Sequence, residues 1–255
     1  MQKLDRWNCC DHPIIIAFEG LDCTYKETNS KALYDHLRKY LSEDQVKLVH
    51  FPNYDSQSSY FVREYLHEKY DNSDVFMSDM SKKKKLKIIA NFYLLDMFDW
   101  WSKLDKKTVK VVIIDRWFYS MMYYLTKSIN KHTPDPNKRV SYASTIYKMA
   151  TEMYKLPMAD IVFRMENDIG TVLEKTVERA KEEDTVLDKY EKDDLYMLKV
   201  KETFNYLNIY KYMTDSFGNT VYNVNVSNKS KEELAACICE KVDGVLCLTE
   251  NELLP

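Results

Sequence analysis

The sequence predicts an α/β protein with a parallel sheet of about five strands and helices on both faces. Short apolar runs alternate with longer helical stretches along the chain. Alternating strands and helices are typical of parallel sheets whose two faces are both covered by helices. Two loops support this prediction, because each carries charged residues directly after an apolar run, where ligands bind in open α/β sheets.

The apolar runs place the predicted strands at residues 14–18, 46–50, 109–114, 160–165 and 220–226. Helices are predicted between them at residues 27–42, 57–68, 82–104, 120–130, 142–154, 193–213 and 231–242. The proline- and aspartate-containing segment 130–139 is predicted to be a loop. We expect a single domain over residues 12–245, with terminal extensions at 1–11 and 246–255.

Composition limits the classes of function. The chain has 255 residues, 45% of them hydrophobic and 30% charged, with a formal net charge of -3 at pH 7. This composition fits a soluble globular protein and lacks the basic excess of a bulk nucleic-acid binder. No apolar run reaches the roughly 18–20 residues of a membrane span, and the N-terminus lacks the apolar segment of a secretion signal. We therefore expect a cytoplasmic protein that binds neither membranes nor nucleic acid.

The loop after the first predicted strand keeps the frame of a phosphate-binding P-loop. In the motif G-x-x-x-x-G-K-[ST], backbone N–H groups surround the phosphates and the lysine reaches the outer ones. Lys26 stands in this register, six residues after Gly20, but Tyr25 replaces the second glycine and Glu27 replaces the hydroxyl residue. Glycine adopts backbone conformations that side chains resist, so we expect Tyr25 to strain the loop and to shield its amides.

Five motifs follow one another along the chain: FEGLD at 18–22, FPNYDSQSS at 51–59, FYLLDMFDW at 92–100, DRWFYS at 115–120 and LDKYEKDD at 187–194. Together they resemble the thymidylate kinases, which are nucleoside-monophosphate kinases that phosphorylate dTMP with ATP and Mg²⁺. The resemblance covers about residues 12–215. It implies a three-layer P-loop kinase fold and, as partners, ATP and a pyrimidine deoxynucleoside monophosphate such as dTMP or dUMP. It also implies Mg²⁺ as the cofactor and a homodimer as the assembly.

The resemblance implies catalytic roles for four charged residues: Lys26, Asp115, Arg116 and Arg179. The lysine and the arginines would neutralise charge on the phosphates, whereas Asp115 would hold Mg²⁺ through water, with Thr28 as a weaker metal ligand. The ATP-binding residues implied are Gly20, Cys23, Thr24, Tyr25, Lys26, Glu27 and Thr28.

The acceptor-binding residues implied by the resemblance are Asp22, Phe51, Pro52, Tyr54, Phe92, Asp96, Ser120, Asp188 and Glu191. Asp22 would contact the sugar 3′-hydroxyl, and the last two residues belong to a lid over about 170–191. Two arginines of the family are missing. Asn53 and Tyr54 stand where many members have an arginine for the acceptor phosphate, and Met97 replaces an arginine that contacts the pyrimidine. Arg63 or a lysine is a candidate replacement for the latter.

These departures leave two hypotheses open. The first is an active kinase for dTMP or a related pyrimidine deoxynucleotide. The second is a catalytically silent relative that serves as a nucleotide-binding or interaction protein. The altered positions Cys23, Tyr25, Glu27 and Met97 favour this second hypothesis. The retained charged residues favour the kinase. Sequence drift after loss of function is not expected to spare all of Asp22, Lys26, Asp115, Arg116 and Arg179.

Overall fold

The computed structural model describes residues 12–67, 80–129, 136–182, 200, 220–227 and 229–246. Its strands are β1 (Ile14–Gly20), β2 (Val46–His50), β3 (Val111–Asp115), β4 (Ile161–Glu166) and β5 (Thr220–Asn225). Its longer helices are α2 (Lys26–Leu37), α5 (Lys82–Lys103), α6 (Phe118–Ile129), α7 (Pro136–Lys148), α8 (Ile169–Glu182) and α11 (Lys231–Leu246). Shorter pieces are the 3₁₀ turn η1 (Gln57–Ser59), helix α3 (Tyr60–Leu66) and the π-helical turn η2 (Met149–Met153).

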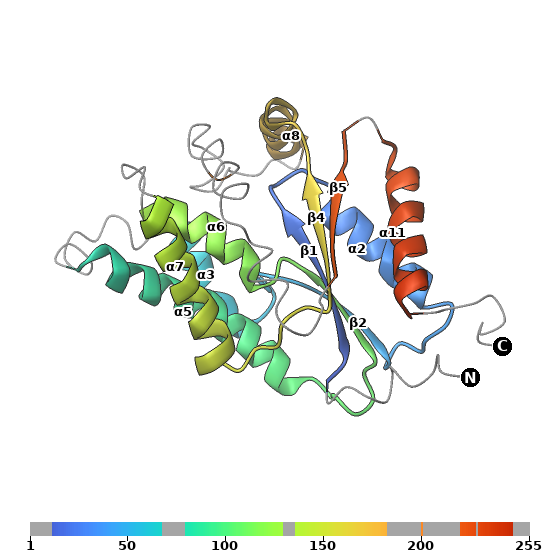
Figure 1. Ribbon diagram of the computed structural model, residues 1–255, viewed down its shortest axis with the longest axis horizontal. Coiled ribbons are helices and arrows are strands. Elements are labelled where there is room, and N and C mark those ends of the chain that lie inside the picture. The colour runs from blue at the N-terminus through green and yellow to red at the C-terminus, as the bar shows by residue number, and fades with distance from the viewer. Residues whose placement is uncertain are drawn as a thin grey trace.

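All described strands belong to one parallel sheet in the order β2-β3-β1-β4-β5. Helices α2 and α11 lie on one side of it, and α3, α5, α6 and α7 lie on the other (Figure 1). This arrangement confirms the predicted fold. The central strand β1 is flanked by β3 and β4, so the chain moves from β1 toward one edge of the sheet and later toward the other. Such a switch point creates a crevice at the carboxyl ends of the strands.

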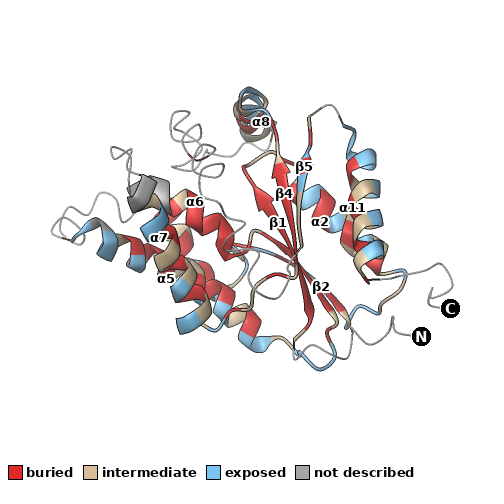
Figure 2. Cartoon of the chain, viewed as in Figure 1, coloured by how far each residue is buried: buried red, intermediate tan, exposed pale blue. Residues whose placement is uncertain are grey.

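Strand β1 is buried along its whole length, as expected for the centre of a parallel sheet (Figure 2). Because successive side chains point to opposite faces, the strand contributes to two cores. Ile14, Ile16 and Phe18 pack with residues of α2 and α11, whereas Ile15 and Ala17 pack with residues of α5, α6 and α7. Two helical layers thus fix the end of β1 from both sides, and the loop that follows starts from a rigid position.

The prediction for residues 130–139 was partly wrong, because α7 begins at Pro136. Proline suits the first turn of a helix, where its missing N–H has no intrahelical partner to lose. Residues 130–135, the predicted helix at 193–213 apart from residue 200, and the extensions at 1–11 and 247–255 lie outside the described residues. Among the helices that the structure describes, none combines the length and apolar character needed to cross a membrane.

Candidate functional site

The loop between β1 and α2 keeps a glycine-like backbone although two of its glycines are absent. Gly20 has a φ of +147°, and a Cβ there would lie only 2.3 Å from the carbonyl oxygen of Met165, so glycine is required. Cys23 and Tyr25 adopt left-handed conformations, with φ of 54° and 60°. This conformation costs a residue with a side chain about 1–2 kcal/mol. The strain expected at Tyr25 is therefore present, and the loop still curves in front of α2.

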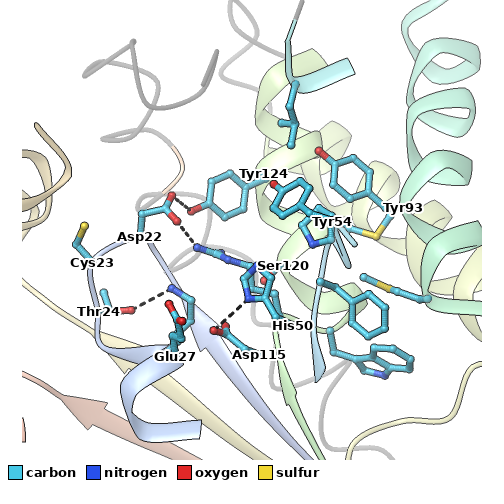
Figure 3. A pocket seen from close by; sticks show the side chains of 18 of the residues that line it. Asp22, Cys23, Thr24, Glu27, His50, Tyr54, Tyr93, Asp115, Ser120 and Tyr124 are labelled. Atoms are coloured by element: carbon cyan, nitrogen blue, oxygen red, sulfur yellow. Dashed lines mark hydrogen bonds and ion pairs between the residues drawn. The ribbon is translucent and has the colours of Figure 1, made fainter. Parts of the chain in front are cut away.

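A cavity of about 470 Å³ opens where this loop meets the carboxyl ends of β2 and β3 (Figure 3). One part of its wall is polar and charged. It consists of Asp22, Cys23, Thr24, Tyr25, Lys26, Glu27, Thr28, His50, Asp115, Arg116 and Arg179. The other part is largely apolar and aromatic. It consists of Phe51, Pro52, Tyr54, Leu66, Tyr93, Met97, Trp117, Ser120, Met121, Tyr124 and Leu125.

Lys26 is the first residue of α2 and is only 5% exposed. Its ammonium group donates to the carbonyl oxygen of Leu21 and lies 3.4 Å from the hydroxyl oxygen of Thr24. Burial, and then the nearby charge of Arg116, lower the pKa of Lys26 to about 8. The loop thus holds a positive charge that is poorly solvated and therefore strongly attracted to an anion.

Arg116 connects the end of β3 to the loop. Its guanidinium donates to the carboxylate of Asp22 and, at 3.1 Å, to the carbonyl oxygen of Gly20. The hydroxyl of Tyr124 donates to the second carboxylate oxygen of Asp22 at 3.0 Å. Burial alone would raise the pKa of Asp22, but the charges of Arg116, Lys26 and Arg179 outweigh it and lower the pKa to about 2. Asp22 is therefore ionised at neutral pH.

Asp115 ends β3 with its carboxylate almost fully buried. One oxygen, Oδ2, lies 3.3 Å from Nδ1 of His50, which ends the neighbouring strand β2. The other oxygen, Oδ1, is buried and has no hydrogen-bond partner among the described residues. Burial would raise the pKa of Asp115, but the hydrogen bond from His50 and the charge of Lys26 lower it. The site thus contains an ionised carboxylate with one oxygen unused by the protein.

A buried network around Glu19 supports the base of the site. Its carboxylate accepts hydrogen bonds from the Trp117 backbone N–H at 2.8 Å, from the Ser120 hydroxyl, and from the Tyr123 hydroxyl at 3.1 Å. Burial outweighs these hydrogen bonds and raises the pKa of Glu19 to about 7. The network ties β1 to the start of α6 and so fixes Ser120 in the wall of the cavity.

Some predicted site residues do not line the cavity. Gly20 packs against the Met165 backbone at the start of the loop, and Phe92 stacks on Phe61 with ring centroids 5.4 Å apart. Asp96 is buried and accepts hydrogen bonds from the Asn53 N–H and the Ser58 hydroxyl, both at 2.7 Å. It therefore shapes the loop after β2. Asp188 and Glu191, at the end of the predicted lid, lie outside the described residues.

Arg63, the candidate replacement for the missing arginine, also stays outside the cavity wall. Its guanidinium donates to the carbonyl oxygens of Tyr54 and Ser56 at 2.6 and 3.0 Å, and to the Ser59 hydroxyl. These contacts brace the loop after β2 from the side of α3. The structure therefore gives Arg63 a positioning role in that loop.

Sequence reasoning missed several residues of the wall: His50, Leu66, Tyr93, Trp117, Met121, Tyr124 and Leu125. Two signals were available. His50 is the last residue of a strand, directly before Phe51, and thus stands at the edge where ligands bind. Tyr124 stands four residues after Ser120, and Leu125 stands four residues after Met121, so the members of each pair lie one turn apart on the same side of α6.

The fold and the site together define a class. A sheet of order 2-3-1-4-5, a lysine-bearing loop after β1 and an acid–arginine pair after β3 constitute the P-loop kinase fold. Among solved structures, a thymidylate kinase from Candida albicans matches with a TM-score of 0.61 and 18% identity, covering 92% of each chain. The crystal structure of thymidylate kinase from Ehrlichia chaffeensis matches with a TM-score of 0.55 and 17% identity, covering 93% of this chain and all of that one.

One curated protein gives a sequence match. It is named "Putative thymidylate kinase 251L", from Invertebrate iridescent virus 6, and is 30% identical over 107 residues. The match covers 42% of this chain and 45% of that protein, so it spans less than half of either. No family model matches the chain. The structural matches show the thymidylate-kinase fold, and the sequence match is a similarity to one putative thymidylate kinase over part of the chain, in agreement with the motifs.

Proposed function

We propose that the protein transfers the γ-phosphoryl group of ATP to dTMP or a closely related pyrimidine deoxynucleotide such as dUMP. The observation that carries the proposal is the convergence of charged side chains beside an apolar chamber. Lys26, Arg116 and Arg179 line the same cavity as Asp22 and Asp115, and the apolar wall begins directly next to them. A phosphate chain fits the first part, and a planar base fits the second.

In the proposed reaction, a phosphate oxygen of the acceptor attacks the γ-phosphorus of ATP, the bond to the bridging oxygen breaks, and ADP leaves. Enzymes that perform this transfer work mainly by positioning the two phosphates and by neutralising charge. Lys26 would follow the transferred group, because a lysine is a flexible point charge. Arg116 is anchored through Gly20 and Asp22 and would present the rest of its planar donor group to the phosphates.

Mg²⁺ is proposed as the cofactor because the residues present fit it. Asp115 supplies an ionised, buried carboxylate whose Oδ1 has no partner in the described part of the chain. Magnesium favours carboxylate and water oxygens, and in nucleotide sites it is usually held by one or two carboxylates together with the phosphates. Glu27 and Thr28, in the first turn of α2, line the same cavity and would be further oxygen ligands. The metal would contribute charge neutralisation between the phosphates.

The apolar part of the cavity supports a pyrimidine acceptor. Phe51 is 1% exposed and is held by Trp117, with ring centroids 5.6 Å apart. Met97 is 2% exposed and lines the same wall. Such a wall recognises a base by shape and by apolar contact with substituents such as the thymine methyl group. Asp22 already accepts hydrogen bonds from Arg116 and Tyr124, but a carboxylate has about four acceptor positions and so can also take a sugar hydroxyl.

The silent-relative hypothesis is less well supported by this geometry. The replacements at Cys23 and Tyr25 have not collapsed the loop, since both residues adopt the backbone conformation that glycine would. An ionised, buried carboxylate whose Oδ1 has no partner among the described residues is costly, and a site without function would not be expected to retain it.

Calorimetric titration tests the proposal. We expect dTMP or dUMP to bind more tightly than AMP or GMP, and ATP–Mg²⁺ to bind as well. Tighter binding of either purine monophosphate would exclude the proposed acceptor. If neither ATP–Mg²⁺ nor any monophosphate binds, the interaction-protein hypothesis would replace the kinase.

A further inference from the structure

Tyr25 reaches away from the acceptor side of the cavity toward α8 and α11. Its hydroxyl accepts a hydrogen bond from the ammonium group of Lys175 on α8 at 2.6 Å. That ammonium lies 4.5 Å from the ring centroid, and the ammonium of Lys231, the first residue of α11, lies 5.8 Å from it. Three separate elements thus bring two positive charges to one aromatic ring at the rim of the loop.

Among the residues that the structure describes, no carboxylate lies within ion-pair distance of Lys175 or Lys231. Two positive charges gathered on one ring without a neutralising carboxylate favour an anionic ligand, and the ring that they share lines the cavity. Tyr25 itself has a strained left-handed backbone conformation.

The position of Lys175 and Lys231 in the fold indicates which anionic group they bind. The apolar wall lies over β2 and β3, between α3, α5 and α6, whereas Lys175 and Lys231 come from helices next to β4 and β5. Phosphoryl transfer needs the attacking and leaving oxygens roughly in line, so donor and acceptor approach the loop from opposite sides. If the acceptor occupies the apolar part, the donor's phosphate chain extends toward Tyr25.

We propose that Tyr25, Lys175 and Lys231 form a clamp for the polyphosphate chain of the donor. The clamp rests on the proposed function and adds a role for the residue that replaces the P-loop glycine. The two ammonium groups bind the phosphates, and the Tyr25 hydroxyl holds Lys175 in place. The clamp recognises phosphates and makes no demand on the donor base.

Calorimetric titration tests the clamp with the wild type, the three variants Lys175→Gln, Lys231→Gln and Tyr25→Phe, and one control variant. The ligands are ATP–Mg²⁺, inorganic tripolyphosphate and dTMP. Lys241→Gln is the matched control. Lys241 is also on α11 and also contacts an aromatic ring, at 4.9 Å from the ring centroid of Tyr222, but it does not line the cavity. We expect each clamp lysine variant to weaken ATP and tripolyphosphate binding by about tenfold at low salt, and less at high salt. Binding of dTMP and the control variant should be unchanged.

A double-mutant cycle separates the clamp from an obstruction. If the Tyr25 hydroxyl acts by holding Lys175, Tyr25→Phe weakens tripolyphosphate binding in the wild type but not in Lys175→Gln. If Tyr25 merely blocks the loop, Tyr25→Phe has the same small effect in both backgrounds and the lysine variants match the wild type, which overturns the clamp. In that case a wild type that binds ATP and dTMP leaves the proposed kinase intact. A wild type that binds neither ATP nor tripolyphosphate overturns both proposals.

Discussion

Arg116 and Asp22 form a largely buried ion pair that ties the end of β3 to the loop after β1. The side chains are 14% and 20% exposed. The guanidinium also contacts the carbonyl oxygen of Gly20, and Arg116 adopts a left-handed backbone conformation with a φ of 69°. The pair therefore fixes the loop to the sheet and, in the same place, presents an arginine to the cavity.

Removing one partner of this pair should be more harmful than removing both. In Asp22→Ala a buried guanidinium loses its counter-charge, and we expect a loss of about 3–5 kcal/mol in the free energy of unfolding at neutral pH. The double variant Asp22→Ala/Arg116→Met should lose less unfolding free energy than Asp22→Ala alone. Chemical denaturation of the single and double variants measures this, and a double variant less stable than both single variants would contradict the ion-pair account.

The same pair predicts a pH dependence. Because the folded-state pKa of Asp22 is lowered to about 2, its stabilising contribution is present above its unfolded pKa of about 4. It is lost as the pH falls through the folded value. The difference in unfolding free energy between the wild type and Asp22→Ala should therefore shrink between about pH 4 and pH 2. A difference that stays constant over this range would mean that Asp22 is not held ionised by its neighbours.

Glu19 should show the opposite dependence. Burial raises its pKa from 4.5 to about 7, so its contribution to stability is full below the unfolded pKa and is lost as the pH rises through the folded value. Glu19→Gln keeps an oxygen for the Trp117 N–H without this titration. We expect the free energy of unfolding of Glu19→Gln to rise relative to that of the wild type by on the order of 3 kcal/mol between about pH 5 and pH 8. Thermal or urea unfolding at several pH values checks this, and parallel curves would contradict it.

Met97 is predicted to set the preference for thymine. A pocket that recognises a methyl group by apolar contact gains about 1–3 kcal/mol from it. We expect dTMP to bind at least about tenfold more tightly than dUMP in the wild type and in the control variant Met97→Leu. In Met97→Ala the ratio should fall toward one, with ATP–Mg²⁺ binding unchanged. If the ratio of dUMP to dTMP dissociation constants is unchanged in Met97→Ala, the thymine methyl group does not contact Met97.

The sequence predicted the fold well because the signals were local. The apolar run of β1 and the helical patterns around it require no knowledge of distant contacts, and the sheet followed from their alternation. The position of Lys26 was predictable for the same reason, since the loop register alone places it at the start of α2.

Long-range pairing limited the prediction of the site. Nothing near Asp96 in the sequence shows that its carboxylate is used by Asn53 and Ser58, and nothing near Arg63 shows that it braces the loop at Tyr54. Likewise, the contact between Tyr25 and Lys175 joins residues 150 positions apart. Sequence patterns assign residue types to faces, whereas such partnerships depend on the packing of whole helices.

The most direct test of the proposed function is turnover itself. A coupled-enzyme assay of ADP release with ATP–Mg²⁺ should be run with dTMP, dUMP, AMP and GMP as acceptors, for the wild type and Lys26→Ala. We expect turnover with dTMP or dUMP that exceeds turnover with either purine by at least about tenfold. We expect Lys26→Ala to lose about a hundredfold or more while unfolding at a similar temperature, because its charge acts on the transition state. Pyrimidine-dependent turnover that is absent from the wild type, or that Lys26→Ala retains within a few-fold, would contradict the account.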